Sequence, residues 1–265
     1  MVPTMFVRLL ALPDEVKARY DTSSLEWITH GAAPCAPDVK RQMIEWLGPV
    51  INEYFGGTEI GLITTANSDD ALRKPGTVGK AITGARIGIF DEAGKPLPPG
   101  GIGEVYVWME GMPDFTYHGL DEKRGEIGRD NLVCIGDIGY LDEDGYLFLT
   151  DRKSFMIISG GVNIYPQEIE NLLVTHPKIM DAAVIGAPCP DLGEKVVAVV
   201  QPRDMADAGP ELEAELRDFL SASLSKIKMP KLFDFRPDLP REANGKLYKR
   251  ELRDEYAARA KEAAV

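Results

Sequence analysis

Residues 151–170 read DRKSFMIISGGVNIYPQEIE, and several local signals follow one another within them. An arginine, Arg152, lies at the start, and the apolar run Met156 to Ile158 predicts a strand. Gly160-Gly161 predicts a turn, and Pro166 is typical of the first turn of a helix. Together these signals predict that a separate folding unit begins near residue 152.

Downstream of this stretch, the patterns of helices and strands alternate. Residues 166–176 predict a helix, 181–185 and 195–201 predict strands, and 211–227 predict a second helix. The second helix carries apolar residues at helical spacing, namely Leu212, Leu216, Phe219, Leu220, Leu224 and Ile227. The last residues are rich in Ala, Glu, Lys and Arg and predict a frayed helix. We therefore expect residues 153–265 to form a small α+β domain.

Upstream, residues 71–152 show short alternating strands separated by clusters of turn residues. Asp144-Gly145 between two short apolar runs is a strong signal for a β-hairpin. This segment is expected to be a β-rich, barrel-like subdomain.

The first 70 residues follow a different pattern, in which helices alternate with strands. We expect an amphipathic helix over 3–20, a strand over 24–31, a helix over 39–46 and a strand over 50–55. Such alternation is typical of an α/β domain. Residues 1–70 are therefore expected to be the remnant of an α/β subdomain.

The composition bounds the function. Apolar residues make up 44% and charged residues 27%, which is the composition of a soluble globular protein. The net charge of −12 argues against nonspecific binding to nucleic acid, which depends on basic residues. No apolar run approaches the length of a membrane-spanning helix, and the N-terminus lacks the pattern of a secretory signal. We expect a cytoplasmic protein.

Cysteines and histidines are few and widely separated. Neither set shows the spacing of a disulfide framework or of a zinc site: Cys35, Cys134 and Cys189, and His30, His118 and His176. Chemistry based on a zinc ion or on disulfides is therefore not expected.

Three short motifs have residue types suited to a nucleotide. In Phe55-Gly56-Gly57-Thr58-Glu59, the glycines permit close backbone approach, and the Thr hydroxyl and Glu carboxylate are oxygen ligands. The alternative is an ordinary loop after a strand, with a capping Thr. Gly31-Ala32-Ala33-Pro34 leaves room for a flat ring but is also read as a plain turn. Asp137 can accept two hydrogen bonds from a sugar diol, or it can be a turn aspartate.

A fourth motif, residues 239–250, reads LPREANGKLYKR. Asn244-Gly245 predicts a tight turn that projects Lys246, a cation able to meet both a carboxylate and a phosphate oxygen. Taken alone, the segment is also typical of a solvated basic stretch before a helix.

In order and spacing, these motifs and residues 151–170 resemble the acyl-adenylate-forming (AMP-binding) superfamily. This superfamily includes acyl-CoA synthetases, the adenylation domains of peptide synthetases, and beetle luciferases. The resemblance spans the chain from about Gly31 to Lys246, and in style it is similar to bacterial fatty-acid and bile-acid-type CoA ligases. It implies the adenylate-forming enzyme fold with its N-terminal part missing, and a mobile lid formed by the last domain.

The resemblance also implies roles for individual residues. Gly31, Ala32, Ala33 and Pro34 would line the adenine pocket; Phe55 would stack on the base, and Gly56 belongs to the same glycine loop. Thr58 would contact the α-phosphate and Glu59 would help to hold Mg²⁺. Asp137 would bind the ribose hydroxyls with help from Arg152. Lys246 would bridge the substrate carboxylate and the α-phosphate, and the Gly160-Gly161 turn would make room for the thiol of coenzyme A.

The implied reaction has two halves: a carboxylic acid and ATP give acyl-AMP, and CoA then displaces AMP. Rotation of the last domain about a hinge at Ser154 would serve both halves with one site. Relatives often have Asp or Lys at this hinge position, Ser or Thr where Ile135 stands, and Tyr where Phe55 stands.

The glycine-, serine- and threonine-rich phosphate loop of the family is not found before Gly31. The sequence therefore predicts an acyl-CoA ligase present as a C-terminal fragment that is inactive alone. Its partners would be a carboxylic acid, ATP and CoA, together with a missing N-terminal half or a second copy of the chain. Two alternatives stay open: an adenylation domain that acylates a carrier protein, and a non-catalytic half-enzyme that binds a nucleotide or a partner.

Overall fold

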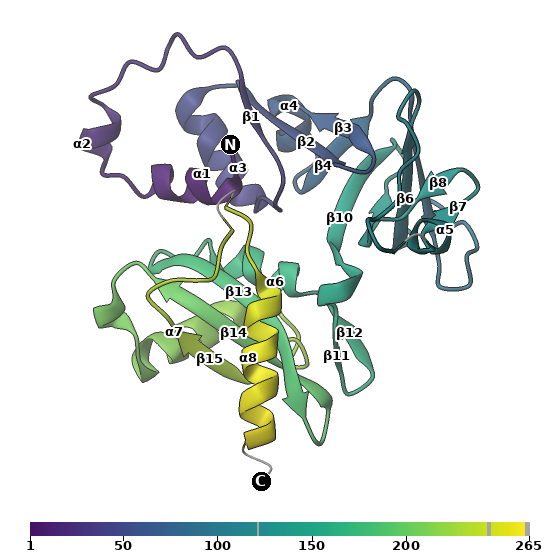
Figure 1. The fold of residues 1–265 in the computed structure, drawn as a ribbon. Coiled ribbons are helices and arrows are strands. Elements are labelled where there is room, and N and C mark those ends of the chain that lie inside the picture. The colour runs from purple at the N-terminus through teal and green to yellow at the C-terminus, as the bar shows by residue number, and fades with distance from the viewer. Residues whose placement is uncertain (121, 243–244, 263–265) are drawn as a thin grey trace. The chain divides into compact units, whose positions relative to one another are not determined.

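The protein is described by a computed structural model that covers residues 1–120, 122–242 and 245–262. The chain divides into two compact units (Figure 1). The first unit comprises Met1 and Leu12–Ser154; the second comprises Val2–Ala11 and the chain from Phe155 onward. Each unit has its own sheet and its own buried core, so each is described by itself.

The first unit is built on one sheet of ten strands within the described residues. Its strand order is β1-β2-β3-β4-β10-β9-β6-β8-β7, and β5 pairs with β6. The strands are β1 (Ile28–His30), β2 (Ile51–Gly57), β3 (Gly61–Ala66), β4 (Thr77–Ala81), β5 (Ala85–Phe90), β6 (Gly103–Met109), β7 (Gly128–Arg129), β8 (Leu132–Val133), β9 (Asp137–Leu141) and β10 (Tyr146–Arg152). The helices are α2 (Asp14–Lys17), α3 (Pro37–Leu47), α4 (Ser68–Arg73) and α5 (Lys123–Glu126).

The sheet continues from the α/β-like segment into the β-rich segment through the pairing of β4 with β10. β1 and β2 are parallel neighbours, whereas β9 and β10 form an antiparallel hairpin. The hairpin predicted at Asp144-Gly145 is confirmed. Gly145 adopts φ 79°, and one oxygen of Asp142 accepts the amide protons of Asp144 and Tyr146.

Two predictions near the N-terminus were wrong. The helix expected over residues 3–20 is two short helices, α1 (Pro3–Leu10) and α2. Pro13 separates them, because a proline has no amide proton to donate and disfavours helical geometry in the residue before it. The strand expected over 24–31 is also shorter, since only Ile28–His30 pair with β2.

The second unit contains a sheet of five strands within the part of the chain described. These strands are β11 (Ile157–Ser159), β12 (Val162–Ile164), β13 (Ile179–Cys189), β14 (Gly193–Pro202) and β15 (Leu232–Phe235). The helices are α1, α6 (Pro166–Leu173), α7 (Pro210–Ser221) and α8 (Lys249–Glu262). The 3₁₀ turn Met205–Asp207 also belongs to this unit, and the 3₁₀ turn Lys153–Phe155 spans the division between the two units.

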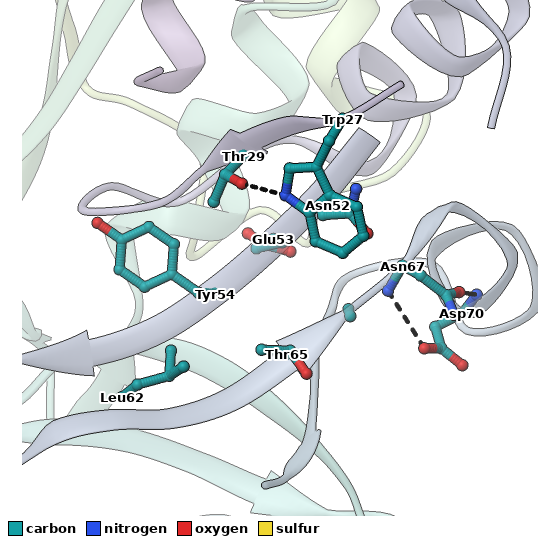
Figure 2. A pocket seen from close by; sticks show the side chains of 10 residues that line it. Trp27, Thr29, Asn52, Glu53, Tyr54, Leu62, Thr65, Asn67 and Asp70 are labelled. Atoms are coloured by element: carbon teal, nitrogen blue, oxygen red, sulfur yellow. Dashed lines mark hydrogen bonds between the residues drawn. The ribbon is translucent and has the colours of Figure 1, made fainter. Parts of the chain in front are cut away.

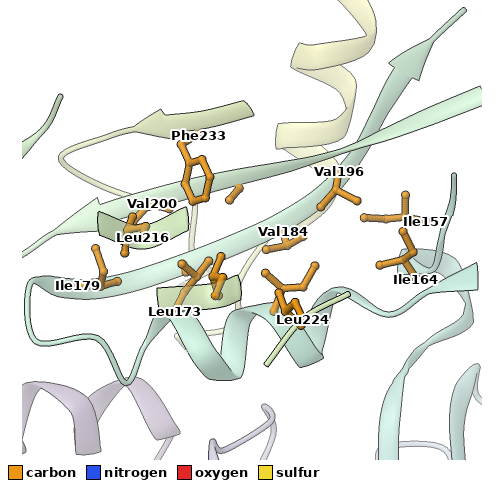
Figure 3. Packing of buried hydrophobic residues seen from close by; sticks show 14 of the residues in the cluster. Ile157, Ile164, Leu173, Ile179, Val184, Val196, Val200, Leu216, Leu224 and Phe233 are labelled. Atoms are coloured by element: carbon orange, nitrogen blue, oxygen red, sulfur yellow. The ribbon is translucent and has the colours of Figure 1, made fainter. Parts of the chain in front are cut away.

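The long hairpin of β13 and β14 is buried on both faces. Successive strand residues point to opposite faces, so Val184, Val196 and Val200 pack with α6 and α7 (Figure 3). Ala183, Ile185, Val197 and Val199 pack on the other face with Leu239 and with Leu252 and Tyr256 of α8. This two-sided burial explains why both strands are continuous apolar runs rather than alternating ones.

The helix predicted over 211–227 ends early, at Ser221. Leu224 is still buried and Ile227 partly buried in the same apolar cluster, but both lie beyond the helix. The helix predicted near the C-terminus is α8, which runs through Glu262, and Leu252 and Tyr256 anchor it to the sheet. No helix in the described ranges has both the length and the apolar character needed to cross a membrane.

Candidate functional site

The glycine loop, residues 55–59, comprises the end of β2 and the first residues of its connection to β3. A Cβ on Gly56 would lie 2.2 Å from the carbonyl oxygen of Gly61, so no larger residue fits there. A Cβ on Gly57 would lie 3.1 Å from Ile135 Cδ1, which places the loop beside the segment that leads into β9. Thr58 is exposed and Glu59 half-buried, so both side chains are accessible to a ligand. Phe55 packs partly against the apolar cluster of the first unit.

Asp137 and Arg152 face each other across the hairpin of β9 and β10. Arg152 Nε lies 3.2 Å from Asp137 Oδ1, and the guanidinium also approaches the carbonyl oxygen of Ile135 at 3.5 Å. The Asp137 side chain is 8% exposed and that of Arg152 41% exposed. The carboxylate is therefore fixed, and the arginine has one side open to solvent.

Sequence reasoning missed one residue of this region, Tyr117, which contacts Glu59. Its hydroxyl donates a hydrogen bond to Glu59 Oε1 at 3.1 Å. Burial and the adjacent Glu59 carboxylate raise the pKa of Tyr117, while the Arg152 charge acts in the opposite direction. The phenol therefore remains a donor throughout the neutral range. No sequence signal identified Tyr117, because it lies in a segment without periodic apolar residues.

The Gly31–Pro34 loop follows β1 and lies against an aromatic ring. A Cβ on Gly31 would come within 2.6 Å of Tyr54 Cε1, so the absence of a side chain lets the Tyr54 ring lie over this backbone. Ala32 has φ 65°, a left-handed conformation that is unusual for alanine. Ala32 and Pro34 are exposed and Ala33 is half-buried.

A cavity of about 540 Å³ lies next to this loop, over β1, β2 and β3 (Figure 2). Tyr54 and Leu62 lie on one side of it, and the Trp27 indole donates to Thr29 Oγ1 at 2.6 Å on the other. The remaining lining residues are Asn52, Glu53, Thr65, Ala66, Asn67 and Asp70. None of the residues predicted from the sequence lines it. Tyr54 lies between the cavity and the Gly31–Pro34 loop, since it lines the cavity and its ring contacts Gly31.

Behind β1 and β2, on the side of α3, three ionisable residues are buried together. Lys40 forms an ion pair with Glu53, and His30 Nδ1 lies 3.9 Å from Glu53 Oε1. Burial, reinforced by the charges of Lys40 and the N-terminal amine, lowers the pKa of His30 to about 3. Burial also raises the pKa of Glu53, against the effect of Lys40. His30 is therefore neutral at physiological pH.

The remaining predicted residues lie in the second unit. Gly160 and Gly161, with φ of 57° and 81°, form an exposed turn between β11 and β12. Lys246 is exposed at its turn, where the Glu242 amide donates to the Lys246 carbonyl at 2.9 Å. The predicted turn residue Asn244 lies outside the described residues. The structure thus brings together Thr58, Glu59, Asp137 and Arg152 in the first unit and keeps Gly160, Gly161 and Lys246 in the second.

The carboxylates present do not form a metal site by themselves. Among the described residues, no three His, Cys, Asp or Glu side chains gather where they could hold an ion. Mg²⁺ is commonly held by one or two carboxylates together with phosphate oxygens and water. Glu59 alone therefore fits a magnesium ion that arrives with a nucleotide, and does not fit a resident metal.

Comparison with known proteins identifies families that this chain resembles. Residues 1–112 match the family described as AMP-binding enzyme, and residues 168–246 match the AMP-binding enzyme C-terminal domain. A fatty acid–[acyl-carrier-protein] ligase of Streptomyces coeruleorubidus is 34% identical over 97% of the chain and 49% of its own length. A long-chain-fatty-acid–CoA ligase of Bacillus subtilis is 34% identical over 96% of the chain and 44% of its own length.

The fold is similar to that of solved structures as well. The amide bond synthetase McbA of Marinactinospora thermotolerans superimposes with a TM-score of 0.84 at 32% identity, covering 97% of this chain and 52% of that one. The chain thus spans about half the length of the relatives that it matches.

Proposed function

The chain belongs to the AMP-binding enzyme family, and from this membership we propose that it contributes part of the nucleotide site and the lid of an AMP-forming carboxylic acid–CoA ligase. One observation carries the proposal. The glycine loop with Thr58 and Glu59 lies beside Ile135, whose carbonyl oxygen is approached by Arg152 of the Asp137–Arg152 pair, and the Tyr117 hydroxyl donates to Glu59. Hydroxyl, carboxylate and guanidinium groups of this kind suit the phosphate and the ribose of one nucleotide.

The proposed roles follow from the exposure of Thr58 and Glu59 and from the fixed position of the Asp137 carboxylate. Thr58 is open to solvent and can donate to the α-phosphate, and Glu59 can share a magnesium ion with phosphate oxygens. Asp137, held by Arg152, accepts hydrogen bonds from the ribose hydroxyls. The Gly31–Pro34 loop and Phe55 are proposed to border the adenine, and the Gly160-Gly161 turn to pass the thiol arm of CoA.

The chemistry needs charge stabilisation more than acid–base catalysis. A carboxylate oxygen attacks the α-phosphorus of ATP, the bond to pyrophosphate breaks, and acyl-AMP forms. The thiolate of CoA then attacks the acyl carbon, and AMP leaves with the electrons of the acyl–oxygen bond. Lys246 is proposed to stabilise the negative charge that develops on the α-phosphate in the first half only.

The acceptor in the second half is the least constrained part of the proposal. The relatives include a ligase that acts on an acyl-carrier protein, a CoA ligase and an amide bond synthetase. An activated carboxylate can react with any of the three corresponding acceptors: a carrier-protein thiol, the CoA thiol or an amine. We favour CoA, and a carrier-protein thiol is the second candidate because a carrier-protein ligase is as similar to this chain as the CoA ligase.

The test is exchange of labelled pyrophosphate into ATP with a panel of fatty and aromatic acids. It is run on the enzyme extended to the length of its relatives and on the 265-residue chain, which we propose is inactive alone. The Lys246→Ala variant is expected to lose acid-dependent exchange by roughly a hundredfold or more. It should keep most of the rate of thioester formation from supplied acyl-AMP. Equal losses in both half-reactions would contradict the role of Lys246, and exchange without any acid dependence would contradict the ligase itself.

A further inference from the structure

The turn that carries Lys246 is closed by its own backbone. The Tyr248 amide donates to the Pro240 carbonyl at 2.9 Å, and the Gly245 amide donates to the Glu242 carbonyl at 2.8 Å. We call residues 240–242 and 245–248 the lysine turn. Gly245 has φ 85°, and a Cβ there would lie 2.9 Å from Val2, so the turn also needs a glycine at this point.

A guanidinium fork holds the lysine turn on its N-terminal side. Arg241 donates through Nε and Nη2 to Asp181 Oδ2, at 2.9 and 2.6 Å. Its third nitrogen, Nη1, donates to the carbonyl oxygen of Gly245 at 2.6 Å, directly before Lys246. The two side chains are only 18% and 12% exposed, so water competes little for these bonds.

A second cation holds the lysine turn on its C-terminal side. Lys249, the first residue of α8, lies with Nζ 2.7 Å from Glu170 Oε1. Both side chains are nearly fully buried, at 6% and 8% exposed. The ammonium also lies 5.0 Å from the centre of the Phe155 ring.

Both carboxylates are themselves fixed to the same strand. β13 is at the end of the strand order, so alternate amide groups on its outer edge have no neighbouring strand to bond. Asp181 Oδ1 accepts the amide proton of Ala182 at 2.9 Å, and Glu170 Oε1 accepts that of Val184 at 2.6 Å. Each carboxylate therefore satisfies a strand amide and a cation at once.

We propose that Arg241 and Lys249 are positioning residues that fasten the lysine turn to the edge of β13, so that the backbone of Lys246 is presented in one orientation. The importance of this device for catalysis rests on the proposed function of Lys246. A lysine side chain has four rotatable bonds, and it can reach a reacting phosphate reproducibly only when the backbone that carries it is fixed. The two ion pairs provide that fixed base.

The test is amide hydrogen exchange of the intact 265-residue chain. In Arg241→Gln and in Asp181→Asn, the amides of Gly245 and Tyr248 are expected to exchange roughly tenfold faster relative to those of β13 and β14. The matched control is Arg236→Gln. Arg236 is also a partly buried fork, 20% exposed, and its described bonds go to Asp234 and Glu255 rather than to the described residues of the lysine turn. The control should leave the ratio unchanged.

Rescue separates positioning from a general loss of stability. Arg241→Lys keeps the charge but cannot bind Asp181 and Gly245 with one planar group, so it should restore only part of the protection. The proposal is wrong if Arg241→Gln and Arg236→Gln change the ratio equally. These outcomes do not depend on activity. If the exchange ratio stays unchanged in Arg241→Gln while the Lys246→Ala enzyme is inactive, the positioning role of Arg241 is refuted and the role of Lys246 stands.

Discussion

Tyr117 shows how much a single hydroxyl can decide at the candidate site. The Tyr117 hydroxyl lies 3.1 Å from Glu59 Oε1, and this hydrogen bond connects the Glu59 carboxylate to the loop of residues 113–120. Without it, Glu59 would lose a neutral donor that orients one of its oxygens and leaves the other available. The orientation of Glu59, rather than its charge, therefore depends on Tyr117.

We expect Tyr117→Phe to weaken binding of Mg²⁺–ATP roughly three- to tenfold, because a hydrogen bond to a charged group is lost while the ring is kept. Calorimetric titration of the chain with the nucleotide measures this. Tyr20→Phe is the control, since Tyr20 is 70% exposed. Equal affinities of the two variants would show that Tyr117 does not orient the site.

His30 links burial to pH at the residue scale. Its pKa falls from 6.5 to about 3, so below pH 6.5 the unfolded chain binds a proton that the folded chain refuses. Stability is therefore lost as the pH falls from about 6.5 toward 3. The raised pKa of Glu53 acts with the opposite sign, and both groups face Lys40.

Between pH 7 and pH 5, neutral His30 should account for about 2 kcal/mol of lost unfolding free energy. His30→Asn removes this contribution and leaves that of Glu53, so the variant should show a shallower dependence of stability on pH. Urea unfolding followed by the fluorescence of Trp27, Trp46 and Trp108, all in the first unit, measures it. His118→Asn, at an exposed ring, should keep the slope of the parent chain; a shared slope for all three proteins would refute the assignment.

At the scale of elements, α7 shows where a helical pattern is right and where it misleads. The apolar stripe correctly indicates the buried face, with Leu212, Leu216 and Leu220 fully buried. Phe219 belongs to the same stripe by spacing, yet it is 37% exposed and lies edge-on against His176 at 5.0 Å. Spacing alone therefore cannot tell that Leu216 is more deeply buried than Phe219.

We expect Leu216→Ala to cost about 3 kcal/mol and Phe219→Ala about 1 kcal/mol, because only the first leaves a cavity in the core. Hydrogen exchange of the β13 and β14 amides, which report on the core under α7, gives both values. Phe219→Ala matching or exceeding Leu216→Ala would show that the stripe, and not the observed burial, sets the energetics.

At the scale of the molecule, the division between the two units falls directly after Ser154, within the 3₁₀ turn Lys153–Phe155. The proposed catalytic groups are distributed across this division, with Glu59 and Asp137 before it and Lys246 and Gly160 after it. We propose that a reaction using the two sets in turn would involve a change of backbone conformation at Ser154.

Ser154→Pro should restrict that change, because a proline fixes φ near −65° and removes an amide proton. We expect thioester formation to fall about tenfold or more while adenylation stays within about threefold, measured as separate half-reactions in the enzyme extended to the length of its relatives. Ser154→Ala, which keeps backbone freedom, is the control and should retain both rates. Equal loss of both half-reactions in Ser154→Pro would argue against a hinge at this position.

The sequence by itself was enough for the family, the fold class and the β9–β10 hairpin, because each depends on local signals: glycines where φ is positive, prolines at helix starts and apolar runs of fixed period. It also named Asp137 and Arg152, which lie 3.2 Å apart in the structure, and their role in binding the ribose stays a prediction. It failed at the break at Pro13 and at the end of α7, where packing and backbone chemistry override a periodic pattern.

Only the tertiary structure could decide which distant residues meet. Tyr117 reaches Glu59 across 58 residues of chain, and Arg241 reaches Asp181 across 60. Such pairs depend on the register of a sheet and on the free edge of one strand, and neither can be predicted from a short stretch of sequence. The sequence determined which residues could do chemistry, whereas long-range packing decided which of them are held in place to do it.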